Sequence, residues 1–109
     1  MTWTAFGNGS SIGLIGSEGG TILRDEEHSV GARITLEQCK YSPFAITCGL
    51  YGNMVHTIFV GTENEGQTKF DGVRSELDYL ISIWPNQDAP QEAIDRFHEA
   101  INGFVERYP

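Results

Sequence analysis

Apolar residues alternate with polar ones through the first half of the chain and recur at helical spacing through the second half. The clearest alternation covers Val30–Cys39. Two further apolar runs, Phe44–Tyr51 and Met54–Val60, flank Gly52-Asn53, a pair that suits a two-residue hairpin turn of type II′. These runs predict that residues 1–61 form an antiparallel sheet.

The glycine-rich start of the chain gives weaker signals. Ile12–Ile15 predicts a short strand between turns, and Thr21–Leu23 a strand that runs out into a polar turn at Arg24–His28. Further along, Tyr41–Pro43 interrupts the alternation, because Pro43 has no N–H for a ladder. The sheet is therefore expected to contain four or five strands.

Two amphipathic helices are predicted within residues 62–109. Thr62 is the expected N-cap of the first, with Glu65 completing a capping box. Trp84-Pro85 ends this helix, since proline disfavours helical geometry in the residue before it. Asp88 is the expected N-cap of the second helix.

Strands followed by helices, instead of alternating with them, predict an α+β fold. At 109 residues the chain is expected to be a single domain, 1–109, with both helices on one face of the sheet. The apolar helical positions are Phe70, Val73, Leu77, Leu80, Ile81 and Trp84 in the first helix, and Ala93, Ile94, Phe97, Ala100, Ile101, Phe104, Val105 and Tyr108 in the second.

The two-residue turn fixes a register, which pairs Tyr51 with Met54 and Cys48 with Thr57. A three-residue turn at Tyr41–Pro43 would likewise pair Leu36 with Cys48. One face then becomes the core: Phe44, Ile46, Cys48, Leu50, Val55, Thr57 and Phe59. The opposite face carries polar residues, as antiparallel sheets commonly do when one side is solvated.

This register argues against cysteine chemistry. A thiol nucleophile needs a histidine within hydrogen-bond reach, and the register puts Cys48 and His56 on opposite faces. It also turns Cys39 away from Cys48, so a disulfide between them is not expected. We interpret Cys48 as a small buried side chain.

Asp25, Glu27 and His28 include hard and borderline metal ligands, but no zinc spacing accompanies them. Whether these three residues bind a metal is left open, and no metal or cofactor is predicted. The glycine-rich segments contain neither a dinucleotide fingerprint nor a Walker sequence. No catalytic motif is present, so we expect a protein that is not an enzyme.

The formal charge of −8 excludes further classes of partner. Nucleic acids and anionic membrane surfaces require a basic stripe, and the chain has none. No apolar run reaches the roughly 18 residues of a membrane span, and no basic region precedes an apolar one as in a signal peptide. A cytoplasmic location is expected.

The candidate binding residues lie on the polar face of the predicted sheet. Gly49 leaves a shallow gap there, and Arg33 beside Tyr51 would place a cation over an aromatic ring. The predicted binding residues are Arg33, Thr35, Glu37, Tyr51, Met54 and His56. We expect this face to bind a protein partner or a second copy of the chain. The alternative is a small-molecule or metal-binding domain, or a weak enzyme, with a site centred on Arg33, Glu37 and His56.

A second candidate surface is the acidic flank of the last helix, formed by Glu92, Asp95 and Glu99. Reversing these three charges should slow association with a basic partner and flatten its salt dependence, because long-range attraction sets the association rate. Stopped-flow mixing over a range of salt concentrations would measure both quantities. Unchanged rates would rule out this surface.

The size, acidity and strands-then-helices plan resemble those of small bacterial inhibitors and immunity-type proteins. The resemblance is one of general plan, and it assigns no role to any residue.

Overall fold

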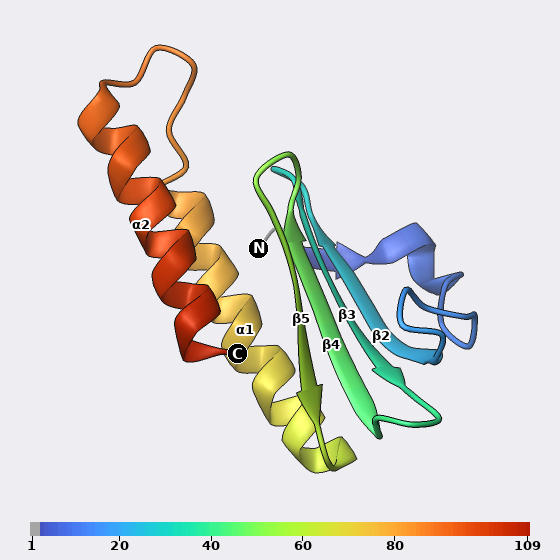
Figure 1. Ribbon diagram of the computed structural model, residues 1–109. Helices are drawn as coiled ribbons and strands as arrows, with labels where there is room; N and C mark the ends of the chain where they lie inside the picture. Colours follow the sequence, from blue (N-terminus) through green and yellow to red (C-terminus); the bar gives the residue numbers. More distant parts are fainter. Residues whose placement is uncertain (1–2) are drawn as a thin grey trace.

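The computed structural model describes residues 3–109 and contains one five-stranded antiparallel sheet followed by two helices (Figure 1). The strands lie in chain order, each hydrogen-bonded to the next. Between β1 and β2 the chain forms a short 3-10 helix, Phe6–Gly9. The elements are β1 (Trp3–Ala5), β2 (Thr21–His28), β3 (Ala32–Gln38), β4 (Phe44–Leu50), β5 (Met54–Val60), α1 (Glu63–Ser82) and α2 (Gln91–Arg107).

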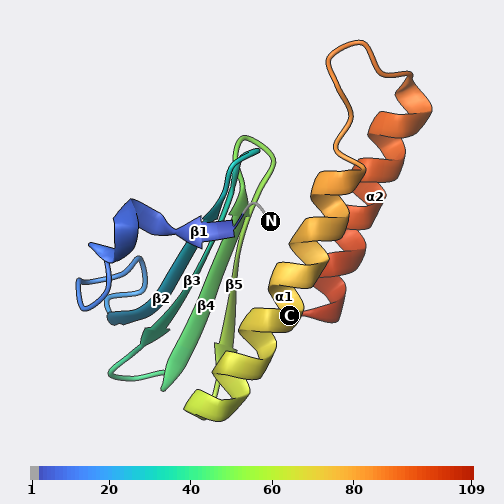
Figure 2. The same cartoon turned by 180° about the vertical axis from the view of Figure 1, so that it is seen from behind.

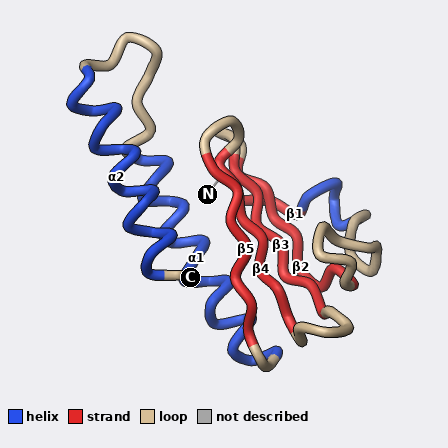
Figure 3. The backbone as a smooth tube through the Cα atoms, in the orientation of Figure 1, coloured by secondary structure: helices blue, strands red, loops and turns tan. Residues whose placement is uncertain are grey.

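The molecule has two layers, which confirms the predicted α+β class. Both helices lie on one side of the sheet, whereas the segment between β1 and β2 lies on the other side (Figures 1 and 2). The tube in Figure 3 shows the long connection between the helices extending past the end of the sheet. We call the side of the sheet that faces the helices the core face and the opposite side the open face.

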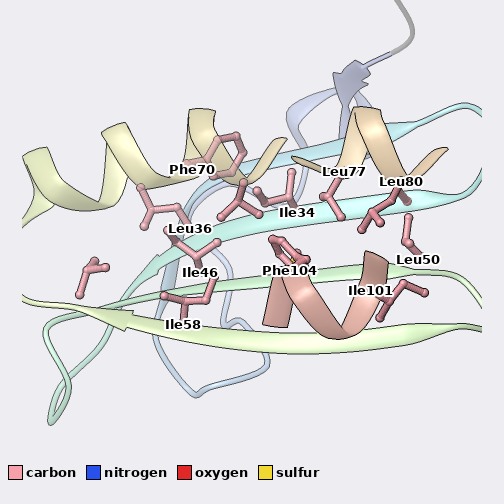
Figure 4. Packing of buried hydrophobic residues seen from close by; sticks show 14 of the residues in the cluster. Ile34, Leu36, Ile46, Leu50, Ile58, Phe70, Leu77, Leu80, Ile101 and Phe104 are labelled. Carbon is pink, nitrogen blue, oxygen red and sulfur yellow. The ribbon is translucent and has the colours of Figure 1, made fainter. Parts of the chain in front are cut away.

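Helix α1 packs mainly over β3 and β4, and the last turns of α2 complete the core (Figure 4). The buried apolar cluster includes Ile34, Leu36, Ile46, Leu50, Ile58, Phe70, Leu77, Leu80, Ile101 and Phe104. Gly66 lies close to the sheet, because a Cβ there would approach Leu36 Cδ1 to 3.0 Å. The periodic apolar residues of the predicted helices thus supply most of the helical side of the core.

The first helix begins where the sequence predicts. The Thr62 side chain accepts a hydrogen bond from the Glu65 N–H at 3.1 Å, which confirms the cap. The cap predicted at Asp88 is wrong: α2 begins at Gln91, with Pro90 as its N-cap residue. Asp88 lies instead in a turn, where its N–H donates to Asn86 Oδ1.

Two expectations for the start of the chain are wrong. Arg24–His28 is not a turn, because β2 continues through it to His28 and pairs with β3 along its length. The strand expected at Ile12–Ile15 is reduced to a single bridge between Ile15 and Thr21. One edge of the sheet is formed by β1, whose Trp3 pairs with His28, and the other edge by β5.

The predicted β4–β5 register is wrong by one residue. The connection has three residues, Tyr51 to Asn53, so Leu50 pairs with Met54. Asn53 N–H donates to Leu50 C=O at 2.9 Å, and Gly52 has a φ of 81°, as the third residue of a type II turn requires. Because side chains alternate between faces, this shift moves all of β5 to the opposite face.

The β3–β4 register also differs from the prediction, but by two residues. Cys39–Pro43 forms a five-residue connection, so Leu36 pairs with Ile46 instead of Cys48, and Arg33 pairs with Gly49 instead of Tyr51. A shift of two residues preserves the faces. The predicted core residues of β3 and β4 therefore remain in the core, whereas Val55, Thr57 and Phe59 lie on the open face.

Candidate functional site

The side chains of the open face form three rows that cross β2, β3, β4 and β5. Thr47 Oγ1 lies 3.3 Å from Thr57 Oγ1, and Thr35 Oγ1 donates to the Thr47 carbonyl at 3.4 Å. The rows are Ile22–Glu37–Ala45–Phe59, Asp25–Thr35–Thr47–Thr57 and Glu27–Arg33–Gly49–Val55. The middle row therefore ends in threonines that contact one another through their hydroxyl groups.

The segment between β1 and β2 covers the β2–β3 half of this face. Phe6 lies under the Arg33 guanidinium, whose central carbon is 3.5 Å from the ring centroid. The predicted cation–aromatic pair of Arg33 with Tyr51 is therefore wrong in its partner. Farther along the segment, Ser11 and Ser17 contact Asp25 and Thr47. The β4–β5 half of the face has no comparable cover among the described residues.

A partly buried ion pair between Arg33 and Asp25 lies under the covered half. Arg33 donates to both oxygens of Asp25, at 2.9 and 2.6 Å, and Ser11 Oγ donates to the same carboxylate at 2.7 Å. The Asp25 side chain is fully buried. The hydrogen bond to Asp25 raises the pKa of Arg33 above its usual value, although partial burial opposes this. Arg33 thus helps to hold the segment between β1 and β2 in place.

Glu37 is also fully buried, and backbone N–H groups bind its carboxylate. Gly20 N–H donates to Oε2 at 2.8 Å and Glu18 N–H donates to Oε1 at 3.3 Å. A Cβ at Gly16 would lie 2.7 Å from Glu37 Oε1, so only glycine permits this approach. The glycine-rich loop therefore binds the carboxyl group of Glu37 through its backbone N–H groups.

A hollow of about 840 Å³ lies beside the covering segment. Its floor includes Thr35, Thr47 and Gly49, and Ile15 and Tyr51 lie on its walls. A volume of this size falls in the range of small-ligand sites, roughly 300–1,000 Å³. The hydroxyl groups of Thr35 and Thr47 and the apolar side chains around them would suit an uncharged or amphipathic group.

Tyr51 is fixed at one end of the hollow by a bond from its hydroxyl to Glu27 Oε2, at 2.7 Å. Partial burial, this hydrogen bond and the charge of Glu27 raise the pKa of Tyr51 to about 12.

We expect Tyr51 to release its proton late in an alkaline titration. The unfolded chain loses the same proton near pH 10. The contribution of this group to stability is therefore complete below about pH 10 and is lost as the pH rises toward 12. Ultraviolet titration of phenolate should show a late step that moves to lower pH in Glu27→Gln. Persistence of that step in Tyr51→Phe would contradict the assignment.

Apolar side chains stand exposed on the uncovered half of the open face. Val55 is 81% exposed and Phe59 is 52% exposed, both on β5. Ile15, on the opposite rim of the hollow, is 72% exposed. Ile15 and Val55 line the hollow, and Phe59 lies on the same face of β5. Exposed apolar side chains gathered in this way are typical of contact surfaces.

The structure divides the six predicted binding residues between the two faces. Arg33, Thr35 and Glu37 are on the open face, and Tyr51 adjoins it in the β4–β5 turn. Met54 and His56 face the core, because of the one-residue register shift. The alternative site centred on Arg33, Glu37 and His56 is therefore not assembled.

His56 contacts the last helix instead of the open face. Its Nε2 lies against the Tyr108 carbonyl, and its ring meets Phe104 edge-to-face at 6.1 Å between centroids. A carbonyl only accepts hydrogen bonds, so Nε2 is the donor. This histidine ties the end of α2 to β5.

The corrected register places Cys48 directly opposite His56, on the core face. The expectation that they lie on opposite faces is wrong, but Cys48 is only 1% exposed and burial raises its pKa to about 12. A buried neutral thiol is a poor nucleophile. Both cysteines are free.

We expect a thiol reagent at about pH 8 to modify Cys39 in the folded protein and leave Cys48 unmodified. Burial and the charges of Glu37 and Glu18 raise the pKa of Cys39, so this reaction should be slower than with a free thiol. Mass spectrometry of the labelled protein would count the modified residues. Rapid labelling of both thiols without denaturant would contradict the burial of Cys48.

The three residues considered for metal binding are separated. Asp25 is bound by Arg33, Glu27 by Tyr51, and His28 lies on the other face against Trp3, with ring centroids 5.1 Å apart. Within residues 3–109, no group of three or more histidine, cysteine or acidic side chains is arranged to hold a metal ion. The acidic surface of α2 fits its prediction in position, since Glu92, Asp95 and Glu99 are all exposed.

Sequence reasoning missed the exposed apolar residues of β5, Val55 and Phe59, because it assigned them to the core. It also missed Phe6 and Ser11, whose partners are distant in the chain. The composition of β5 could have indicated its exposed apolar residues, because the strand is apolar on both faces.

Comparisons with protein-family models, with curated proteins and with solved structures gave no match to this chain. Among residues 3–109, no helix combines the length and the apolar character needed to cross a bilayer.

Proposed function

We propose that this protein is a non-catalytic interaction module that contacts a protein partner, or a second copy of itself, through the β4–β5 half of the open face. The proposal rests on three exposed apolar side chains on this side of the sheet: Ile15 and Val55, which line the hollow, and Phe59, which lies on the same face of β5. Exposed apolar side chains gathered beside a concave polar floor are a feature of recognition surfaces.

The test is capture of partners from a lysate of the native host by the tagged protein, with quantification by mass spectrometry. A Val55→Ser, Phe59→Ser variant should lose the specific partner. The matched control is Val30→Ser, Tyr41→Ser, which removes two exposed apolar side chains from turns outside the proposed surface. Equal recovery by both variants would contradict the proposal.

The volume of the hollow favours a second candidate function, binding of a small amphipathic ligand. Gly49 has no side chain, so the hollow is open above this part of its floor. A Cβ at this position would approach the Met54 carbonyl to 3.2 Å. A ligand found in a thermal-shift screen of metabolites should lose its stabilising effect in Thr47→Val, which removes a floor hydroxyl and preserves shape. Thr68→Val, on the exposed surface of α1, is the control.

A further inference from the structure

The outer edge of the sheet at β5 is unusual for an acidic protein. The chain carries a formal charge of −8, yet the seven residues Met54–Val60 contain no Asp, Glu, Lys or Arg, and also no Pro or Gly. Proteins commonly protect an edge strand with charges, proline or a bulge, because its free N–H and C=O groups accept another strand. None of these devices is present on β5.

The edge is also accessible in the described part of the chain. Strand β5 is last in the sheet order, and within residues 3–109 no backbone hydrogen bond links it to a segment outside the sheet. Helices α1 and α2 lie on the core face of the sheet (Figures 1 and 2). At the opposite edge, β1 is only three residues long.

We infer that β5 pairs antiparallel with β5 of a second copy, joining two five-stranded sheets into one; this inference rests on the proposed function. Thr57 is the central residue of β5, so a two-fold axis through it pairs all seven residues. Thr57 then opposes Thr57 of the second copy, and Val55 opposes Phe59. Both are favourable cross-strand pairs, threonine with threonine and β-branched with aromatic.

This register agrees with the arrangement of the faces. An axis perpendicular to the sheet keeps the open faces of both copies on the same side and the helices on the other. The threonine row that ends at Thr57 would continue across the junction, and the exposed Val55 and Phe59 would each become covered. Pairing of identical, uncharged strands also avoids placing like charges opposite each other within the strand pair.

The area of contact between the two copies determines how strongly they are expected to associate. Seven paired residues extend about 24 Å, and a sheet layer with a helix layer is about 20 Å thick. Each copy would therefore contribute about 500 Å², or about 1,000 Å² in total, near the lower limit for a specific interface. We expect a dimer that dissociates on dilution.

Sedimentation equilibrium on the full chain tests the inference. The wild-type protein should show a concentration-dependent monomer–dimer equilibrium, and Val55→Lys should raise the dissociation constant by about tenfold or more, since the substitution acts on both copies. Val30→Lys is the control, because Val30 is exposed in the β2–β3 turn. Wild-type protein that stays monomeric up to millimolar concentration would overturn the inference, as would a dimer that Val55→Lys does not weaken.

Disulfide trapping tests the register separately. In a Cys39→Ser background, Thr57→Cys should form a covalent dimer under mild oxidation, whereas Thr68→Cys on α1 should not. Equal trapping of the two would overturn the register. If the wild type is monomeric but the Val55→Ser, Phe59→Ser variant still loses a captured partner, the self-pairing is wrong and the proposed function stands. A dimer dissociated by Val55→Lys supports the self-pairing even when no other protein is captured.

Discussion

Replacing Arg33 with methionine will lower the free energy of unfolding by about 3 kcal/mol, the lower end of the cost of breaking a buried ion pair, because Asp25 is fully buried but the Arg33 side chain is 35% exposed. Asp25 would lose two hydrogen bonds while its fully buried carboxylate kept only Ser11 as a donor. Phe6 would also lose the guanidinium that lies over its ring. Urea denaturation followed by circular dichroism would measure the change.

Two further variants separate the charge effect from general damage. Substituting Asp25 with leucine in the Arg33→Met protein should recover much of the lost stability, because an apolar pair leaves no buried charge. Lys40→Met is the matched control, since Lys40 is exposed in the β3–β4 connection. If the Arg33→Met protein were as stable as the Lys40→Met control, the ion pair would not hold the covering segment.

Glu37→Ala should be the second largest loss, about 2 kcal/mol, because the buried Gly20 N–H would lose its acceptor and the more exposed Glu18 N–H would lose its partner. Hydrogen exchange should report where the loss acts, with faster exchange at Gly20 N–H, which donates to Glu37 at 2.8 Å. Glu37→Gln, which keeps one acceptor oxygen, should fall between the alanine variant and the wild type. Gln38→Ala, at the exposed neighbouring position, is the control.

Slow exchange at Gly20 in Glu37→Ala would mean that the loop is held by its other contacts. Gly16 N–H donates to the Gly20 carbonyl at 2.8 Å within the loop itself, so this outcome has a definite structural basis.

Substitutions of Arg33 and Glu37 would also affect binding experiments. Arg33 and Glu37 fix the wall of the hollow, so their substitution would change recognition indirectly, unlike substitutions at Val55.

The sequence predicted the fold class and the core of β3, β4 and α1, because each has a clear one-sided pattern. It failed at β5, where both faces are apolar: Ile58 and Val60 face the core, and Val55 and Phe59 face outward. Alternation then gives no register, and only the turn decides it. Because the predicted turn had two residues instead of three, the prediction placed His56 on the wrong face. It also assigned the exposed side chains of β5 to the core.

The charged strand β2 was missed for a different reason. Four consecutive charged residues, Arg24 to Glu27, are typical of a solvated turn. Their partners come from elsewhere in the fold: Glu26 binds Arg74 of α1 at 2.6 Å, and Asp25 binds Arg33 of β3. Non-local charge pairing of this kind leaves no periodic signal in the sequence, and neither do the contacts of Phe6 and Ser11 with the open face.

The chain-order arrangement of the five strands bears on how the protein folds as it leaves the ribosome. Each strand can pair with the one synthesised just before it, so the sheet can assemble hairpin by hairpin. The helices that cover its apolar side, Glu63–Ser82 and Gln91–Arg107, emerge after all five strands. Nascent chains therefore expose this side until both helices have been synthesised, and we expect chaperone contact to fall sharply only when the second helix clears the exit tunnel.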